Sequence, residues 1–294
     1  MYSCFKIKRF FKLVICDVVV ILFITVIMNF NKDKWFAFDN NSDEKISLPV
    51  IMYHLISENP SKLGDYVVSP QTIENDFRFL KENGYEAVLV EDLLNYINGD
   101  IPLPENPVII TFDDGYYNNM VYLLPLLEKY DMKAIISIVG SYTERDSKSK
   151  EPPNVNYSYL TWEDISALTK TDLIEIGNHT YDLHTSDIRK GSCIMNGESE
   201  EQYRQIFKNN VGLLQSELFM NSGVMPITFT YPYGFDCEES VPILKELGFK
   251  ATFTCRERPN YISKDENSLY GLNRYNRPNG VSTEEFMSNL LAEK

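Results

Sequence analysis

The sequence predicts an α/β protein, a (β/α) barrel of about seven parallel strands that is preceded by one N-terminal transmembrane helix. From residue 47 onward, short apolar runs alternate with longer amphipathic stretches, which indicates βαβ units and a parallel sheet. The length of this region suits a closed barrel, which typically takes about 250 residues. An open doubly wound sheet is the alternative, although no glycine-rich dinucleotide-binding fingerprint supports it.

The expected elements follow from the position of each pattern along the chain. Thr161 and Asp164 have the spacing of a capping box at the start of a helix. Gly84 and Gly248 stand where helices are expected to end. The expected strands are residues 49–53, 86–90, 108–112, 133–139, 173–176, 227–231 and 251–254, and the expected helices are residues 73–83, 122–130, 161–169, 198–219 and 240–247.

The N-terminus differs in character from the rest of the chain. Residues 1–12 hold basic side chains and no acidic one, and residues 13–30 are apolar except for Asp17, Thr25 and Asn29. A run of this length predicts a membrane span whose basic flank stays in the cytoplasm. A cleaved signal peptide is the alternative, but no small-residue cleavage site follows the run.

The resulting domain plan has three parts. Residues 1–30 are the basic flank and the transmembrane signal-anchor, residues 31–47 are a polar linker, and residues 48–294 are the α/β domain. The expected location is the cell membrane, with a single span and the α/β domain outside the cytoplasm, or secretion if the anchor is cleaved. In this plan the membrane is a partner through the anchor.

Charge and cysteine content exclude several other functions. The 294-residue chain has a formal net charge of −14, which argues against nucleic-acid binding, since that needs a basic footprint. Beyond the anchor the cysteines are odd in number and lack CxxC spacing, so they predict neither a disulfide framework nor a cysteine zinc site. No protein partner is evident.

Polar residues stand at the ends of four of the expected strands. VIMYH ends in His54, VIITFDDG contains Asp113 and Asp114, LIEIGNHTYDLH carries His179 and His184, and ITFTYPYG ends in Tyr233 and Gly234. In barrels and in open α/β sheets the active site lies at the carboxyl ends of the strands. We therefore expect these groups to meet on one rim.

The histidines and aspartates predict a metal site. Two histidines and one carboxylate supply the three protein ligands of a catalytic zinc site and leave a position open for water. His179 and His184 are five residues apart, which would separate them around a helix, so a loop is the expected setting. A metal would also offset the repulsion between Asp113 and Asp114, leaving one aspartate as a base; spacing alone does not say which.

These motifs resemble those of the polysaccharide deacetylases, carbohydrate esterase family four, also called the NodB-homology domain. The resemblance covers residues 48–290 and rests on TFDDG (111–115), HTYDLH (179–184) and FTYPYG (229–234). It implies a distorted (β/α) barrel that hydrolyses N-acetyl groups on a sugar polymer and releases acetate.

The resemblance also implies residue roles. Asp113 would be the general base, while Asp114, His179 and His184 would hold a divalent metal, usually zinc, with cobalt, nickel or iron as alternatives. The backbone N–H of Tyr233 would help to stabilise the oxyanion. Tyr116, Tyr181 and Pro232 are expected to contact the substrate, with ordinary barrel packing as the alternative for the two tyrosines.

Departures from the family pattern narrow the choice of expected substrate. Family histidines are usually four residues apart, and the longer spacing here, together with Met52-Tyr53-His54 and the Tyr-Pro-Tyr-Gly form, is similar to deacetylases of poly-β-1,6-N-acetylglucosamine, the biofilm polysaccharide. Thr230 replaces the arginine often found in the third motif. No histidine follows His184, so His54 either replaces the usual general acid or is structural.

The expected function is therefore metal-dependent N-deacetylation of an extracellular polysaccharide that contains N-acetylglucosamine. Peptidoglycan, chitin-like oligomers and xylan are alternative substrates. A non-catalytic carbohydrate-binding barrel is the alternative function.

Overall fold

The structure is a computed structural model that describes residues 45–99, 101–184, 189 and 191–292. The predicted anchor and most of the predicted linker lie outside these residues. Within the described part of the chain, no helix is both long enough and apolar enough to cross a membrane.

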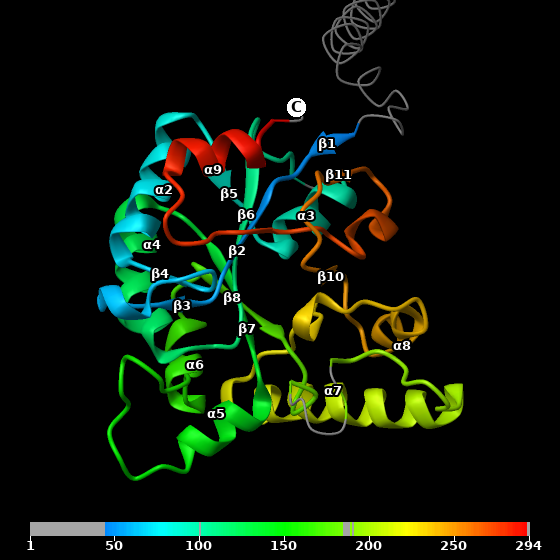
Figure 1. Cartoon of the computed structure of the whole chain (residues 1–294). Helices are drawn as coiled ribbons and strands as arrows, with labels where there is room; N and C mark the ends of the chain where they lie inside the picture. Colours follow the sequence, from blue (N-terminus) through cyan, green and yellow to red (C-terminus); the bar gives the residue numbers. More distant parts are fainter. Residues whose placement is uncertain (1–44, 100, 185–188, 190, 293–294) are drawn as a thin grey trace, which may run out of the picture. The chain divides into compact units, whose positions relative to one another are not determined.

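A curled parallel sheet forms the centre of the domain (Figure 1). Its strands are hydrogen-bonded in the order β10-β9-β8-β7-β6-β2-β12, and β5 also pairs with β6. Every pairing in this sheet is parallel. The strands are β2 (Val50–Tyr53), β5 (Glu86–Ala87), β6 (Pro107–Phe112), β7 (Ala134–Ile138), β8 (Ile174–Asn178), β9 (Thr228–Thr230), β10 (Ala251–Phe253) and β12 (Tyr275–Asn276).

Helices connect the strands and contact one another around the sheet. Helix α9 contacts α2, α2 contacts α4, α6 contacts α5 and α7, and α7 contacts α8. The helices are α2 (Pro70–Glu82), α3 (Val90–Ile97), α4 (Leu124–Tyr130), α5 (Gly140–Ser147), α6 (Trp162–Leu168), α7 (Glu200–Ser222), α8 (Ser240–Glu246) and α9 (Thr283–Leu290). A π-helical turn, Asn119–Leu123, precedes α4, and short 3-10 turns occur at Pro60–Lys62, Pro232–Gly234 and Glu266–Leu269.

The C-terminal segment brings the two ends of the sheet together. Leu272 forms backbone hydrogen bonds with Thr252 and Thr254 at β10, and β12 pairs with β2 three residues later. A single stretch of chain thus contacts β10 at one edge of the sheet and supplies β12 at the other, which is consistent with a barrel.

Alternate residues of the strands face two separate cores, as expected for a sheet buried on both sides. Ile51, Ile110 and Ile136 belong to the cluster packed against the helices. Their neighbours Val50 and Ile109 belong to a second cluster, which α3 and the C-terminal segment complete.

The parallel sheet and its helices confirm the predicted class, and each predicted strand overlaps an observed one. The predicted capping box is confirmed, since Thr161 and Asp164 exchange hydrogen bonds at the start of α6. Val90, placed in a strand by the sequence pattern, instead begins α3. Strand β12 and helices α3, α5 and α9 were not expected.

Short local pairings account for the remaining strands. β1 (Ile46–Ser47), which falls in the predicted linker, pairs with β11 (Tyr261–Ile262) in antiparallel fashion. β3 (Leu55–Ile56) pairs with β4 (Val67–Val68). Two-residue strands have no periodicity that a sequence pattern could show.

Candidate active site at the carboxyl ends of the strands

The DDG turn directs both aspartates into one site. Consecutive side chains of a strand normally point to opposite faces, but β6 ends at Phe112, and Asp114 and Gly115 have φ values of 70° and 73°. Gly115 is required here because a Cβ atom would lie 2.8 Å from the side chain of Ile138. The turn therefore breaks the strand alternation.

Asp114, His179 and His184 form a cluster that could hold a metal ion. The Nε2 atoms of His179 and His184 lie 3.7 and 3.3 Å from Asp114 Oδ1, and one candidate ligand atom from each residue lies within 4.8 Å of the others. Asp114 Oδ1 is buried without a hydrogen-bond partner. An orphaned carboxylate oxygen facing two imidazole nitrogens fits a divalent cation.

The surroundings of His179 keep it in the form that binds a metal. Burial lowers its pKa to about 4, so the ring is neutral near pH 7. Its Nδ1 lies 2.8 Å from the carbonyl oxygen of Thr230, and donation to that oxygen leaves the lone pair on Nε2. His184 follows on a loop after β8, as its spacing predicted, because Thr180 turns the chain with φ 70°.

Asp113 is bound by Arg274, a residue that sequence reasoning missed. The guanidinium donates to both carboxylate oxygens at 2.7 Å, and both side chains are buried. Burial alone would raise the pKa of Asp113, but the charge and hydrogen bonds of Arg274 hold it well below its ordinary value. Arg274 thus holds Asp113 in place and in its ionised form.

Arg274 supplies the charge that the third motif lacks. Thr230, which stands where the family often has arginine, hydrogen-bonds to Ser137 instead. Arg274 comes from the segment just before β12, far from that motif in sequence. Its only sequence signal was a basic residue in a short stretch without periodicity, NRYNRP.

His54 faces Asp113 from the end of β2. Its Nε2 lies 3.8 Å from Asp113 Oδ2, and its ring makes an edge contact with Tyr66. Among the described residues, the buried His54 Nδ1 has no hydrogen-bond partner.

The Tyr-Pro-Tyr-Gly turn lies against the metal-site loop. Pro232 is buried, whereas Tyr233 is 38% exposed and has a φ of 58°. The Tyr233 hydroxyl donates to the carbonyl oxygen of His184 at 3.1 Å, and the two rings lie 4.6 Å apart. Gly234 permits this turn, because a Cβ atom would lie 2.5 Å from Cys255 Cβ.

The two predicted substrate tyrosines differ in position. Tyr116 lies directly after the DDG turn and stacks on Tyr159; burial, with the nearby Asp114 charge, raises its pKa. Tyr181 packs against Gly140 at the start of α5 and against the helix-side core. Packing against α5 and the core therefore explains much of the position of Tyr181, whereas Tyr116 lies next to the Asp114-His179-His184 cluster.

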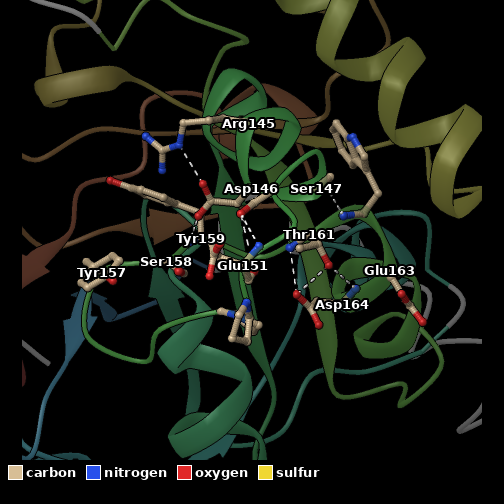
Figure 2. A pocket seen from close by; sticks show the side chains of 14 residues that line it. Arg145, Asp146, Ser147, Glu151, Tyr157, Ser158, Tyr159, Thr161, Glu163 and Asp164 are labelled. Carbon is tan, nitrogen blue, oxygen red and sulfur yellow. Dashed lines mark hydrogen bonds and ion pairs between the residues drawn. The ribbon is translucent and has the colours of Figure 1, made fainter.

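A cavity of about 1040 Å³ opens beside α5, α6 and the loop between them. Figure 2 shows Arg145, Asp146 and Tyr159 on one side of it and Thr161, Glu163 and Asp164 on the other. Tyr159 is shared between this cavity and the site, since it stacks on Tyr116. No sequence pattern predicted the cavity.

Fold and site together define a class: a curled parallel α/β sheet with an Asp-His-His cluster and an arginine-held aspartate at the carboxyl ends of its strands. The sequence profile described as polysaccharide deacetylase matches residues 100–253, slightly more than half of the chain. The chain belongs to the polysaccharide deacetylase family.

Two curated relatives share this region. A poly-β-1,6-N-acetyl-D-glucosamine N-deacetylase of Escherichia coli K12 is 26% identical over 223 residues, which cover 69% of this chain and 33% of that protein. The chain thus spans about a third of the length of that relative. A protein of the same name from Staphylococcus aureus MSSA476 is 23% identical over 209 residues, covering 71% of this chain and 67% of that one.

Solved structures share the fold. A de-N-acetylase from Aggregatibacter actinomycetemcomitans matches with a TM-score of 0.71 and 20% identity, covering 83% of this chain and all of that one. IcaB from Ammonifex degensii matches with a TM-score of 0.62 and 23% identity, covering 83% and 96%.

Proposed function

We propose that this chain is a metal-dependent hydrolase that removes N-acetyl groups from an extracellular polysaccharide containing N-acetylglucosamine, and that the polymer is poly-β-1,6-N-acetylglucosamine. The observation that carries the proposal is the Asp114-His179-His184 cluster beside an ionised, arginine-held Asp113. The names of the relatives from Escherichia coli and Staphylococcus aureus support the choice of polymer.

Each residue has a role that its surroundings allow. Asp113, which Arg274 keeps ionised, accepts the proton of the attacking water. His54, with Nε2 3.8 Å from Asp113 Oδ2, donates a proton to the leaving amine. Proton transfers of this kind contribute roughly 10²–10⁴ in rate each.

Asp114, His179 and His184 would hold the divalent metal, for which zinc is the first choice. When bound, it supplies Lewis acidity toward water and the acetyl carbonyl. The backbone N–H of Tyr233, in the turn beside His184, is proposed to stabilise the oxyanion, a contribution worth roughly 10²–10³ in rate.

Acetate release from defined oligomers tests this function. The purified chain is stripped with a chelator and supplied with zinc, cobalt or nickel, and acetate is measured from β-1,6- and β-1,4-linked N-acetylglucosamine oligomers. Metal-restored release from the β-1,6 series alone is the expected result. Release from the β-1,4 series would instead indicate peptidoglycan or chitin-like substrates.

The same assay separates an enzyme from a binding protein. If the chain takes up one equivalent of metal and binds the oligomers but releases no acetate, it is a non-catalytic carbohydrate-binding barrel. Acetylated xylan is the remaining polymer to include in the assay, because an ester-linked acetyl group requires the same attack on a carbonyl.

We further propose that residues 13–30 anchor the chain in the membrane with residues 48–294 outside the cytoplasm. Protease added to intact cells should then digest the catalytic domain and leave the N-terminal segment in the membrane. Protection of the domain in intact cells would contradict this orientation.

A further inference from the structure

Two cysteines lie together beside the active site, although they are distant in sequence. Cys193 follows the loop that carries His184, and Cys237 follows the turn that carries Tyr233. Cys193 Sγ lies 3.0 Å from the carbonyl oxygen of Phe235. Both cysteines are free and partly exposed, so solutes can reach them.

Tyr203 of α7 contacts both cysteine segments. Its hydroxyl donates to the carbonyl oxygen of Ser192 at 3.0 Å and lies 3.4 Å from Cys237 Sγ. Cys237 lies two residues beyond Phe235, so the contact between the Cys193 thiol and the Phe235 carbonyl oxygen places the two cysteines in neighbouring segments.

These contacts make Cys237 the more acidic thiol. The neighbouring Cys193 thiol has the largest effect on the Cys237 sulfur, and together with the backbone N–H of Ile194 it outweighs burial and lowers the pKa of Cys237 to about 6. The same interaction raises the pKa of Cys193. A thiolate is the form that reacts with disulfides.

We propose that Cys193 and Cys237 are a reversible disulfide site that links the His184 loop to the Tyr233 turn when the protein meets a disulfide oxidant. The inference is independent of the proposed deacetylase activity, because it rests on the two thiols alone.

The oxidant is a small disulfide of the glutathione type, and the exchange balances. Cys237 thiolate attacks one sulfur of the oxidant, the S–S bond breaks, and one thiol leaves. Cys193 then attacks the Cys237 sulfur of the mixed disulfide and expels the second thiol. Two protein thiols are oxidised, one disulfide is reduced to two thiols, and the two thiol protons end on the products.

The crosslink would fix segments that already touch. A Cβ atom on Gly191 would lie 3.2 Å from the carbonyl oxygen of Pro232, and the Tyr233 hydroxyl donates to His184 O. A covalent bond between residues 193 and 237 would therefore hold a proposed metal ligand and the adjacent turn in register. It would also close a long loop that contains α7, which restricts the unfolded chain.

The test begins with the full chain, reduced, freed of reductant and equilibrated with oxidised glutathione. Free thiols are alkylated after unfolding, and non-reducing peptide mapping identifies each cysteine, including Cys4 and Cys16. The expected product is one peptide pair joined through Cys193 and Cys237. The thermal midpoint should rise by about 4 °C or more and return when reductant is added.

Cys193→Ser and Cys237→Ser are the matched controls. In Cys193→Ser, Cys237 should stop at the mixed disulfide with glutathione, and the midpoint should not rise. In Cys237→Ser, Cys193 should react slowly. The proposal is overturned if wild-type Cys193 and Cys237 remain alkylatable, or if both carry glutathione without a crosslink.

Discussion

Two arginines of the C-terminal segment, Arg274 and Arg277, each bind a buried aspartate, but the two pairs have different roles. Arg274 binds Asp113 in the site, and Arg277 binds Asp76 of α2. Because the two arginines flank β12 at an odd spacing, their side chains leave opposite faces of the strand. One points to the strand ends that hold the metal cluster, and the other points to the helices.

The difference between the pairs lies in what else the carboxylate binds. Asp76 also accepts hydrogen bonds from the hydroxyls of Tyr53 and Thr283, at 2.9 and 2.6 Å. Asp113 has no comparable additional partners among the described residues and instead faces His54 at 3.8 Å. The carboxylate of Asp76, whose oxygens accept several hydrogen bonds, stabilises the fold. The carboxylate of Asp113 has fewer partners on the side that faces the site and can accept a proton there.

Glu175 extends the comparison, because its half-buried carboxylate pairs with no cation among the described residues. Its Oε2 accepts from the backbone N–H of Val90 at 3.1 Å, and its Oε1 is inaccessible to solvent. Burial raises its pKa to about 7, the opposite direction to Asp113. The arginine, and not burial, therefore decides which buried carboxylate is ionised at neutral pH.

The largest expected effect is on catalysis and follows from substitution in the Asp113–Arg274 pair. Asp113→Asn should lower kcat/KM for acetate release by about 10²–10⁴, because the amide cannot accept the proton. Metal analysis should still find one equivalent of zinc, since Asp114, His179 and His184 are intact. Asp114→Asn, the matched control, should lose both metal and activity; a fully active Asp113→Asn would remove the proposed base.

Substitution in the Asp76–Arg277 pair should affect stability instead of catalysis. Asp76→Asn leaves the Arg277 charge buried without compensation and should lower the free energy of unfolding by about 3–5 kcal/mol, measured by urea denaturation. Turnover per folded molecule should stay near wild type. The control is Asp131→Asn, at an exposed ion pair with Lys81, which should change stability by less than about 1 kcal/mol. A large loss of turnover in folded Asp76→Asn would show that the Asp76–Arg277 pair also serves catalysis.

Glu175 should make stability depend on pH. Folding favours its protonated form, so its stabilisation is complete below the unfolded pKa and is lost as pH rises through about 7. Glu175→Gln should therefore be more stable than wild type by about 3 kcal/mol at pH 8 and nearly equal at pH 4. Denaturation at several pH values measures this, with exposed Glu128→Gln as the control. Parallel pH curves for wild type and Glu175→Gln would show that Glu175 is ionised in the fold.

The smallest effect is expected when the bidentate hydrogen bonding of Arg274 is removed but its charge is kept. Arg274→Lys keeps the charge but loses the bidentate geometry, so the pKa of Asp113 should rise toward its ordinary value. The acidic limb of kcat/KM should then move to higher pH, and kcat/KM at pH 7 should fall about tenfold. An unchanged pH profile would mean that a lone positive charge suffices and that the fork is not needed.

The sequence by itself determined the parallel α/β class and the approximate positions of the predicted strands, because apolar runs and capping residues are local signals. It also singled out Asp113, Asp114, His179 and His184, since strand ends in a parallel sheet share one edge. The structure brings these residues together, and their roles stay a prediction.

Only the tertiary structure decided what surrounds those residues. Arg274 reaches Asp113 across 161 positions of sequence, and Cys193 meets Cys237 across α7. The turn at Asp114, whose positive φ no period-two pattern predicts, directs both aspartates into the site. Local patterns record which face a residue takes. Which charge or thiol it meets there depends on long-range packing, and that packing fixes whether a buried carboxylate is ionised.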